Sequence, residues 1–173
     1  YDTATHELAG DIALNGTSGA VAYDPTGGLL AACNETTAEI WFWDARSFAV
    51  AGRAIELPAA VMNAAQNVAF SPDGSRLATG QNDGYVRLWD VETRRALGPA
   101  FEHGGLVNGV AFSADGRRIA STNGAGETAK VWDVTTGRQI GPTLRHQGVV
   151  WGVAFHPAGE LLVVRSNDPG ANL

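Results

Sequence analysis

The sequence predicts an all-β fold built from repeated four-stranded antiparallel sheets, and three observations support this prediction. A short apolar strand followed by a turn recurs at residues 21–27, 68–74, 110–116 and 153–159 of the 173-residue chain. A Trp-Asp pair follows the first three of these segments, and the steps from Trp43 to Trp89 and from Trp89 to Trp132 are 46 and 43 residues. No segment shows a sustained helical period of apolar residues. A period of about 40–45 residues corresponds to one four-stranded unit.

The strands of one unit can be read along its sequence. Residues 67–70 are apolar and β-prone, and they end at a Pro-Asp-Gly turn in which proline fixes φ and glycine accepts a positive φ. A second strand at 76–79 ends at an Asn-Asp-Gly turn, and a third strand follows at 85–89. We expect a shorter, outermost strand near 95–97. One such sheet cannot bury both of its faces, so the units must stack.

These motifs resemble the WD-repeat family. The matching segments are Phe-Ser-Pro-Asp-Gly at 70–74 and Asp-Gly-Tyr-Val-Arg-Leu-Trp-Asp at 83–90, and the resemblance extends over essentially the whole chain. It implies a β-propeller of four-stranded antiparallel blades. The expected divisions of this single propeller segment, 1–173, are an outer strand of a preceding blade at 1–11, blade 1 at 12–52, blade 2 at 53–98, blade 3 at 99–141 and an incomplete blade 4 at 142–173.

The two ends of the chain fall at the same phase of the repeat. Tyr1-Asp2 aligns with Trp-Asp, and the next Trp would fall just past Leu173. One interpretation is a fragment of a longer propeller, which the lack of an initial Met favours. The other is closure, in which the N-terminal strand completes the last blade of a four-bladed ring or of a larger ring made by two chains. We expect a fragment or partial ring that self-associates through its open sheet faces.

Composition and charge exclude several classes of partner. Lys and Arg number 12 against 18 Asp and Glu, without a basic run, so we expect no nucleic-acid partner. No apolar stretch reaches the roughly 20 residues that span a membrane, so we expect no membrane association. Cys33 is the single cysteine, which excludes an intrachain disulfide and a CxxC metal pair. We expect a cytoplasmic protein.

The resemblance also implies a polar network in each blade. In the family, a His before the first strand, a Ser or Thr on the second, an Asp in the following turn and the Trp of the third strand are linked by hydrogen bonds. No blade here carries the full set, and the turn at 124–127 of blade 3 lacks the Asp. We assign a structural role to the members present, which are Trp43, Thr79, Asp83, Trp89, His103, Ser121, Trp132, His146 and Asp168.

No motif in the sequence points to catalysis. The chain has no GxSxG elbow, no HExxH and no P-loop. The inner strands carry no recurring acid or histidine that would converge on a central channel. We therefore predict a non-catalytic protein without a cofactor or metal. The alternative is a propeller enzyme with its active site in the central channel.

The binding face is expected where loops enter and leave the inner strands. The position four residues before the aromatic of each inner strand holds Gly19, Gln66, Asn108 and Trp151. Trp151 is the leading candidate because an exposed Trp is a typical interface anchor, although packing between blades explains a Trp equally well. Asn82 and Asn167 should reach the same face.

The predicted function is a protein–protein interaction scaffold whose partners are other proteins or peptides. The Leu-Gly-Pro and Ile-Gly-Pro links at 97–99 and 140–142 have a bacterial character. We therefore expect the chain to be the sensor or binding region of a larger bacterial signalling protein.

Overall fold

The computed structural model describes residues 12, 18–34, 36–58, 65–159 and 162–167. These residues form fourteen strands: β1 Ser18–Tyr23, β2 Leu29–Asn34, β3 Glu39–Asp44, β4 Ile55–Glu56, β5 Ala65–Phe70, β6 Arg76–Gln81, β7 Tyr85–Asp90, β8 Phe101–Glu102, β9 Val107–Phe112, β10 Arg118–Asn123, β11 Thr128–Asp133, β12 Gln139–Arg145, β13 Val150–Phe155 and β14 Leu162–Ser166. Within these ranges, no helix is long and apolar enough to cross a membrane.

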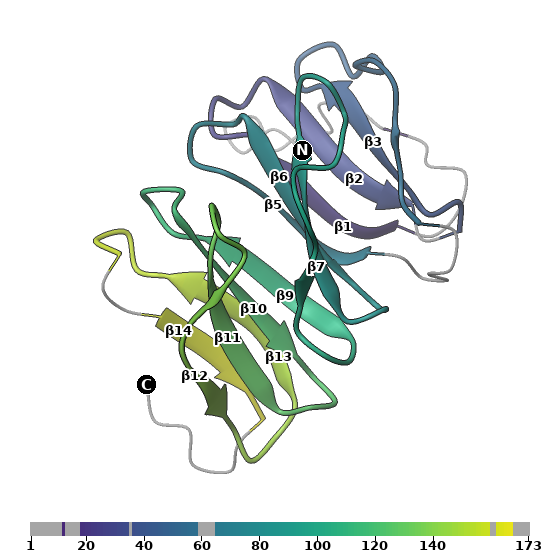
Figure 1. The fold of residues 1–173 in the computed structure, drawn as a ribbon. Helices are drawn as coiled ribbons and strands as arrows, with labels where there is room; N and C mark the ends of the chain where they lie inside the picture. The colour runs from purple at the N-terminus through teal and green to yellow at the C-terminus, as the bar shows by residue number, and fades with distance from the viewer. Residues whose placement is uncertain (1–11, 13–17, 35, 59–64, 160–161, 168–173) are drawn as a thin grey trace, which may run out of the picture.

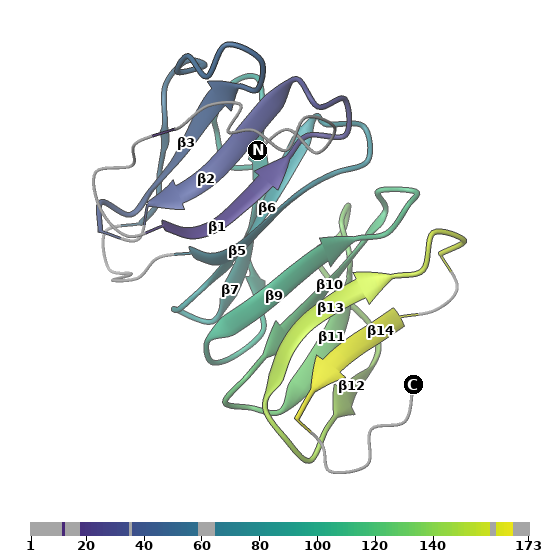
Figure 2. The ribbon, with the colours of Figure 1, turned by 180° about the vertical axis from the view of Figure 1, so that it is seen from behind.

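The strands form four antiparallel sheets that follow the order of the sequence. The sheets are β1-β2-β3-β4, β5-β6-β7-β8, β9-β10-β11-β12 and β13-β14. Figure 1 shows them one after another from the purple to the yellow end of the chain. The inner strands β1, β5, β9 and β13 lie side by side, each in contact with the next (Figure 2). The first and last sheets lie at opposite ends of an open arc (Figure 1). The predicted all-β propeller of four-stranded blades is confirmed, and it forms a partial ring.

Apolar side chains between neighbouring sheets form two core clusters. The first, between sheets one and two, contains Phe42 and Leu77, and the second, between sheets two and three, contains Val86 and Ile119. These four side chains are completely buried. The middle strands are covered on both faces, so β2 and β6 contain continuous runs of buried residues, 31–34 and 77–81, rather than an alternation of buried and exposed ones.

The aspartate of each Trp-Asp pair closes the turn that follows its strand. Asp90 Oδ1 accepts hydrogen bonds from the backbone N–H and the hydroxyl of Thr93, both at 2.7 Å. Asp44 and Asp133 accept the same pair of bonds from Ser47 and Thr136. These bonds hold the pKa of each aspartate below its ordinary value. The recurring aspartates therefore have structural work in the turns.

The outer strands of the first three blades end later than the sequence suggested. In blade 2, Ala96 bridges to Trp89, and β8 resumes the pairing when Phe101 and Glu102 face Val86 and Tyr85. The expected limits at 52 and 98 therefore fall just before β4 and β8, and the limit at 141 falls inside β12, so that these outer strands end at 56, 102 and 145. In blade 2 the resumed pairing of β8 with β7 could not be predicted from the sequence, because Gly98 and Pro99 are residues typical of a loop. Proline has no N–H for the ladder, and the strand is interrupted there and then continues.

Arginines at the start of the second strand join successive blades. Arg118 Nη2 donates to Gly159 O at 2.8 Å, and its guanidinium lies 5.5 Å from the centre of the Phe155 ring. Arg76 makes the equivalent bond to Gly116 O at 3.3 Å. Each arginine therefore links its own sheet to the Gly-containing turn of the next sheet.

Candidate functional site

A hollow of about 660 Å³ opens where the chain enters the inner strands β9 and β13. It brings together three of the predicted face residues, Asn82, Asn108 and Trp151. They come from the β6–β7 turn, from β9 and from β13. The complete described lining is Asn82, Leu106, Asn108, Gly124, Ala125, Val149 and Trp151.

Trp151 presents about half of its surface to solvent. Its exposed fraction is 49 %, whereas Val150, its neighbour in the strand, is completely buried. The pairing of β13 with β14 shifts register between Val150 and Gly152, and at this irregularity Val150 is buried while the indole of Trp151 is exposed. A large apolar ring that is exposed beside a concave surface is the usual form of a binding anchor.

Asn108 supplies hydrogen-bonding capacity at the same hollow. Its Nδ2 donates to Val150 O at 3.4 Å, which ties β9 to β13. Its Oδ1 is buried and has no hydrogen-bond partner among the described residues. A buried acceptor without a partner is costly, and an N–H group brought into the hollow would satisfy it.

Of the two other predicted face residues, Asn167 stands outside this lining. Gln66 lies in β5, at the position that corresponds to Asn108 and Trp151. Asn167 is exposed, and its backbone N–H donates to Val149 O at 3.1 Å, next to the rim. The apolar wall residues Leu106 and Val149 were not singled out from the sequence. Only their place just before β9 and β13 could have indicated them.

The polar network of blade 3 has a member that sequence reasoning missed. Trp132 Nε1 donates to Ser121 Oγ at 2.8 Å, and His103 Nδ1 lies 2.6 Å from the same oxygen. His103 Nε2 lies 3.1 Å from Thr128 Oγ1, a hydroxyl at the start of β11. Thr128 therefore fills the role expected of the turn aspartate that blade 3 lacks.

Burial and a nearby cation keep His103 neutral. The side chain is 4 % exposed, and the ammonium of Lys130 donates to the backbone oxygen of His103 at 2.8 Å. Burial first, and the Lys130 charge second, lower the pKa of His103 to about 4. A histidine that is enclosed and neutral in this way holds the blade together and is closed to substrate.

The other predicted network residues are partly brought together. In blade 2, Trp89 Nε1 donates to Thr79 Oγ1 at 3.1 Å, and Asp83 forms an ion pair with Arg87 at 2.7 Å. Trp43 is buried in blade 1. The backbone N–H of His146 donates to Glu127 O at 2.8 Å, and Asp168 lies outside the described residues, as does the expected outer strand at 1–11.

The chemistry of the hollow is that of a contact surface. Its described lining contains no acid, histidine, cysteine or cation. Across the described ranges, no group of three or more His, Cys, Asp or Glu side chains is placed to hold a metal ion. The arrangement can bury an apolar side chain against Trp151, Leu106 and Val149 and can hydrogen-bond a backbone through its amides.

Comparison with protein families places the repeat in a known group. The family model described as WD domain, G-beta repeat, matches residues 63–90, 99–133 and 138–169. Together these three stretches cover more than half of the chain.

The chain is also similar to parts of several longer proteins. It is 43 % identical over 54 residues to the U5 small nuclear ribonucleoprotein 40 kDa protein of Mus musculus, which covers 31 % of this chain and 15 % of that protein. It is 37 % identical over 62 residues to Protein HIR1 of Phaeosphaeria nodorum, a match that covers 30 % of this chain and 6 % of that protein. It is 28 % identical over 99 residues to the Periodic tryptophan protein 2 homolog of Schizosaccharomyces pombe, a match that covers 57 % of this chain and 11 % of that protein. The matches thus span at most 15 % of the length of these relatives.

Proposed function

Because the chain belongs to the WD domain, G-beta repeat family, as its motifs indicated, we propose that it is a non-catalytic scaffold that binds other proteins through the hollow around Trp151. One relative is named as a protein of a small nuclear ribonucleoprotein, which is a multi-component particle. Proteins that are similar to part of this chain therefore include a component of such a particle.

The observation that carries this proposal is the half-exposed Trp151 beside the buried acceptor of Asn108. The volume of about 660 Å³ lies within the roughly 300–1,000 Å³ that is typical of ligand pockets. An extended peptide would place one apolar side chain against the indole and direct a backbone N–H at Asn108 Oδ1. The uncharged lining favours an uncharged segment of the partner.

The experiment starts from peptides selected by display on the 173-residue chain. Fluorescence anisotropy then measures the dissociation constant of each selected peptide for the wild type and for Trp151→Ala. We expect the variant to bind at least about 30-fold more weakly, because truncating an interface hot spot costs about 2 kcal/mol or more.

Tyr23→Ala is the matched control, since Tyr23 is a 61 % exposed aromatic side chain of β1 at the other end of the arc. It should leave peptide affinity unchanged. Equal affinity of the wild type and Trp151→Ala for every selected peptide would contradict the proposed face.

We further propose that this face belongs to the sensor region of a larger bacterial signalling protein in the cytoplasm. The support is the Gly-Pro pairs at 98–99 and 141–142, which have a bacterial character. The reading frame that encodes the chain tests this proposal. A kinase or ATPase domain in that frame would support it, and a frame that encodes WD repeats alone would count against it.

The alternative function, a propeller enzyme that uses the central channel, gains no support from the hollow. General acid–base or nucleophilic chemistry needs a titratable or nucleophilic side chain at the reacting atom, and the described lining supplies none.

A further inference from the structure

The groove between blades 1 and 2 is filled by an arginine from the chain itself. Arg94 lies four residues after Asp90, in the turn that this aspartate closes, with φ at 60°. Its guanidinium carbon lies 3.5 Å from the centre of the Phe42 ring, and its Nη2 donates to Ala51 O at 3.1 Å. The side chain therefore crosses from blade 2 onto blade 1 and covers the groove.

The equivalent groove between blades 2 and 3 lacks such a side chain. Gly137 stands four residues after Asp133, with φ at 69°, and its N–H makes the same turn bond to Asp133 O at 2.9 Å. With no side chain at this position, a pocket of about 200 Å³ remains open. Its lining is Arg76, Leu88, Leu97, Gly98, Pro99, Phe101, Val134, Thr135 and Gly137.

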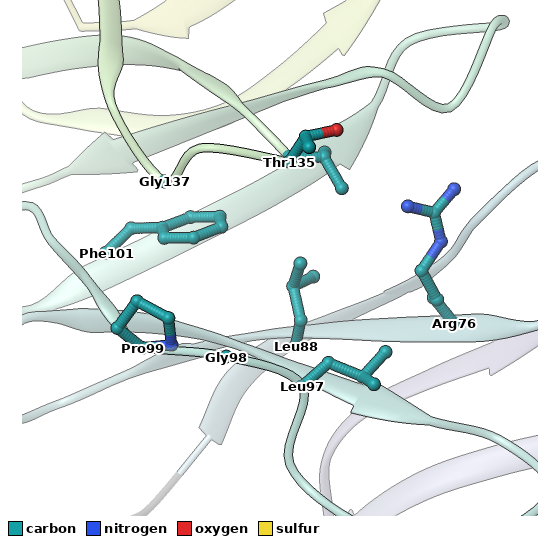
Figure 3. Close-up of a pocket in the computed structure, with 9 residues that line it drawn as sticks. Arg76, Leu88, Leu97, Gly98, Pro99, Phe101, Thr135 and Gly137 are labelled. Atoms are coloured by element: carbon teal, nitrogen blue, oxygen red, sulfur yellow. The ribbon is translucent and has the colours of Figure 1, made fainter.

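Figure 3 shows how the walls of this pocket differ. Arg76 stands at one side, Phe101 and Pro99 at the other, and Leu88 and Leu97 between them. Leu88 occupies the place that Phe42 has in the first groove, because Leu97 N bonds to Leu88 O as Ala51 N bonds to Phe42 O. The second groove therefore keeps an apolar side chain, Leu88, at its base, but it lacks a side chain equivalent to Arg94.

The two grooves differ in the charge of their walls. Leu29 begins β2, whereas Arg76 begins β6 at the same register. The first groove therefore accepts the cation of Arg94, but the second already has a guanidinium in its wall. That guanidinium has five N–H donors, and the bond to Gly116 O uses one of them. Asp73 Oδ2 lies 3.9 Å away, longer than the roughly 2.7–2.9 Å of a charge-assisted hydrogen bond.

We propose that the pocket between blades 2 and 3 is a second binding site, which takes a glutamate side chain of a partner protein. The two methylene groups of the glutamate would pack on Leu88, Leu97 and Phe101, and its carboxylate would meet Arg76. A guanidinium can bind a carboxylate through two parallel bonds, which fixes the orientation of the incoming side chain.

The size of the pocket selects a single side chain. About 200 Å³ is below the roughly 300–1,000 Å³ of small-molecule sites. The net charge of −6 opposes an acidic partner at long range, but ionic strength near 0.15 M screens charges beyond about 8 Å. The described linings of this pocket and of the Trp151 hollow share no residue, so the two sites can be tested separately.

The test is an NMR titration of the 173-residue chain at physiological ionic strength. The probes are three capped peptides, acetyl-Ala-Glu-Ala-amide and its counterparts with Gln or Arg in the middle. We expect the Glu peptide to shift the amide signals of Gly98, Phe101 and Gly137 in a saturable way. The neutral Gln peptide should bind about tenfold more weakly, since it loses the charge-assisted bonds, and the Arg peptide more weakly still.

Two arginine variants locate the site. Arg76→Met should abolish the preference for Glu over Gln, whereas Arg118→Met removes the equivalent arginine of blade 3 and should leave the preference unchanged. Trp151→Ala should also leave it unchanged, so this result does not depend on the face proposed above. Equal binding of the Glu and Gln peptides to the wild type, tighter binding of the Arg peptide, or no saturable shift would overturn the proposal even if Arg76→Met failed to fold.

Discussion

The hydrogen-bond network around the buried His103 of blade 3 shows how one residue can couple stability to pH. His103 is enclosed by Ser121, Thr128 and Trp132, and its partners are hydroxyls rather than a carboxylate. A hydroxyl can bond to the neutral ring, but it cannot offset the charge of a protonated imidazole. The folded state therefore resists protonation of His103.

We predict that the free energy of unfolding falls as the pH is lowered from 7 to 5. The pKa of His103 is about 4 in the folded chain and about 6.5 when unfolded, so between these values the unfolded state binds the extra proton. From pH 7 to pH 5 the loss should be about 2 kcal/mol. Aspartates with lowered pKa values stay charged in this window and contribute little. Denaturant unfolding at each pH measures the change.

His103→Gln should remove most of this pH dependence, and His156→Gln, in an exposed turn, should keep it. A wild-type chain whose stability is flat between pH 7 and pH 5 would show that His103 is accessible to protons when folded.

The network also marks how far sequence reasoning reaches at this scale. His103, Ser121 and Trp132 could be chosen because they stand at the family positions. Thr128 could not, because the β10–β11 turn is one residue longer than the β6–β7 turn and moves a hydroxyl into the place of the aspartate. Insertion of one residue changes which side chain points at the histidine, and a motif that compares residues at fixed positions cannot predict this change.

At the scale of the element, the hairpin turns between second and third strands carry unequal strain. The last residue before the third strand has a positive φ in all three complete blades, where it is Ala38, Gly84 and Glu127. For a residue with a Cβ atom this left-handed conformation costs about 1–2 kcal/mol. The turn of blade 2 avoids that cost, and those of blades 1 and 3 do not.

We predict that Glu127→Gly raises the free energy of unfolding by up to about 1 kcal/mol. The gain is the relief of φ at 52°, reduced by the greater chain entropy of glycine, and little packing is lost because Glu127 is exposed. The midpoint of urea unfolding measures it. Ala125→Gly, at an exposed position of the same turn without a positive φ, should lower stability instead. A lower midpoint for Glu127→Gly would refute the strain argument.

The elements themselves were predictable where turn chemistry and period coincide. Residues 67–70, 76–79 and 85–89 lie in β5, β6 and β7 as expected. The outer strand was not predictable at its far end, since Phe101 pairs with Val86 only after the interruption at Gly98 and Pro99. The pairing there depends on the neighbouring strand and not on local preference.

At the scale of the whole molecule, the open arc leaves apolar side chains exposed at both ends. Val21 and Tyr23 of β1 are 64 % and 61 % exposed, and Val163 of β14 is 48 % exposed. Their strand neighbours Ala20 and Ala22 point the other way and pack against the first core cluster. The outer faces of the first and last sheets thus remain uncovered among the described residues.

We predict concentration-dependent self-association through these faces. Sedimentation velocity should show a coefficient that rises with protein concentration, because contiguous exposed apolar surface favours association. Tyr23→Lys combined with Val163→Lys should suppress the rise, whereas Val50→Lys, at an exposed position away from the inner strands, should not. A wild-type chain that stays monodisperse at high concentration would contradict the prediction.

The stacking of successive sheets has a consequence for kinetics, which the chain's single cysteine makes measurable. Cys33 is 1 % exposed and lies in the core cluster between the first two sheets. A thiol reagent can reach it only when that interface opens, so the rate of labelling measures the opening of the interface between the first two blades. The expected outcome is labelling that Arg94→Met accelerates strongly, because Arg94 spans that interface, and that Arg118→Met accelerates far less. Equal acceleration of labelling by the two substitutions would mean that the blades separate together in one cooperative step, and not one interface at a time.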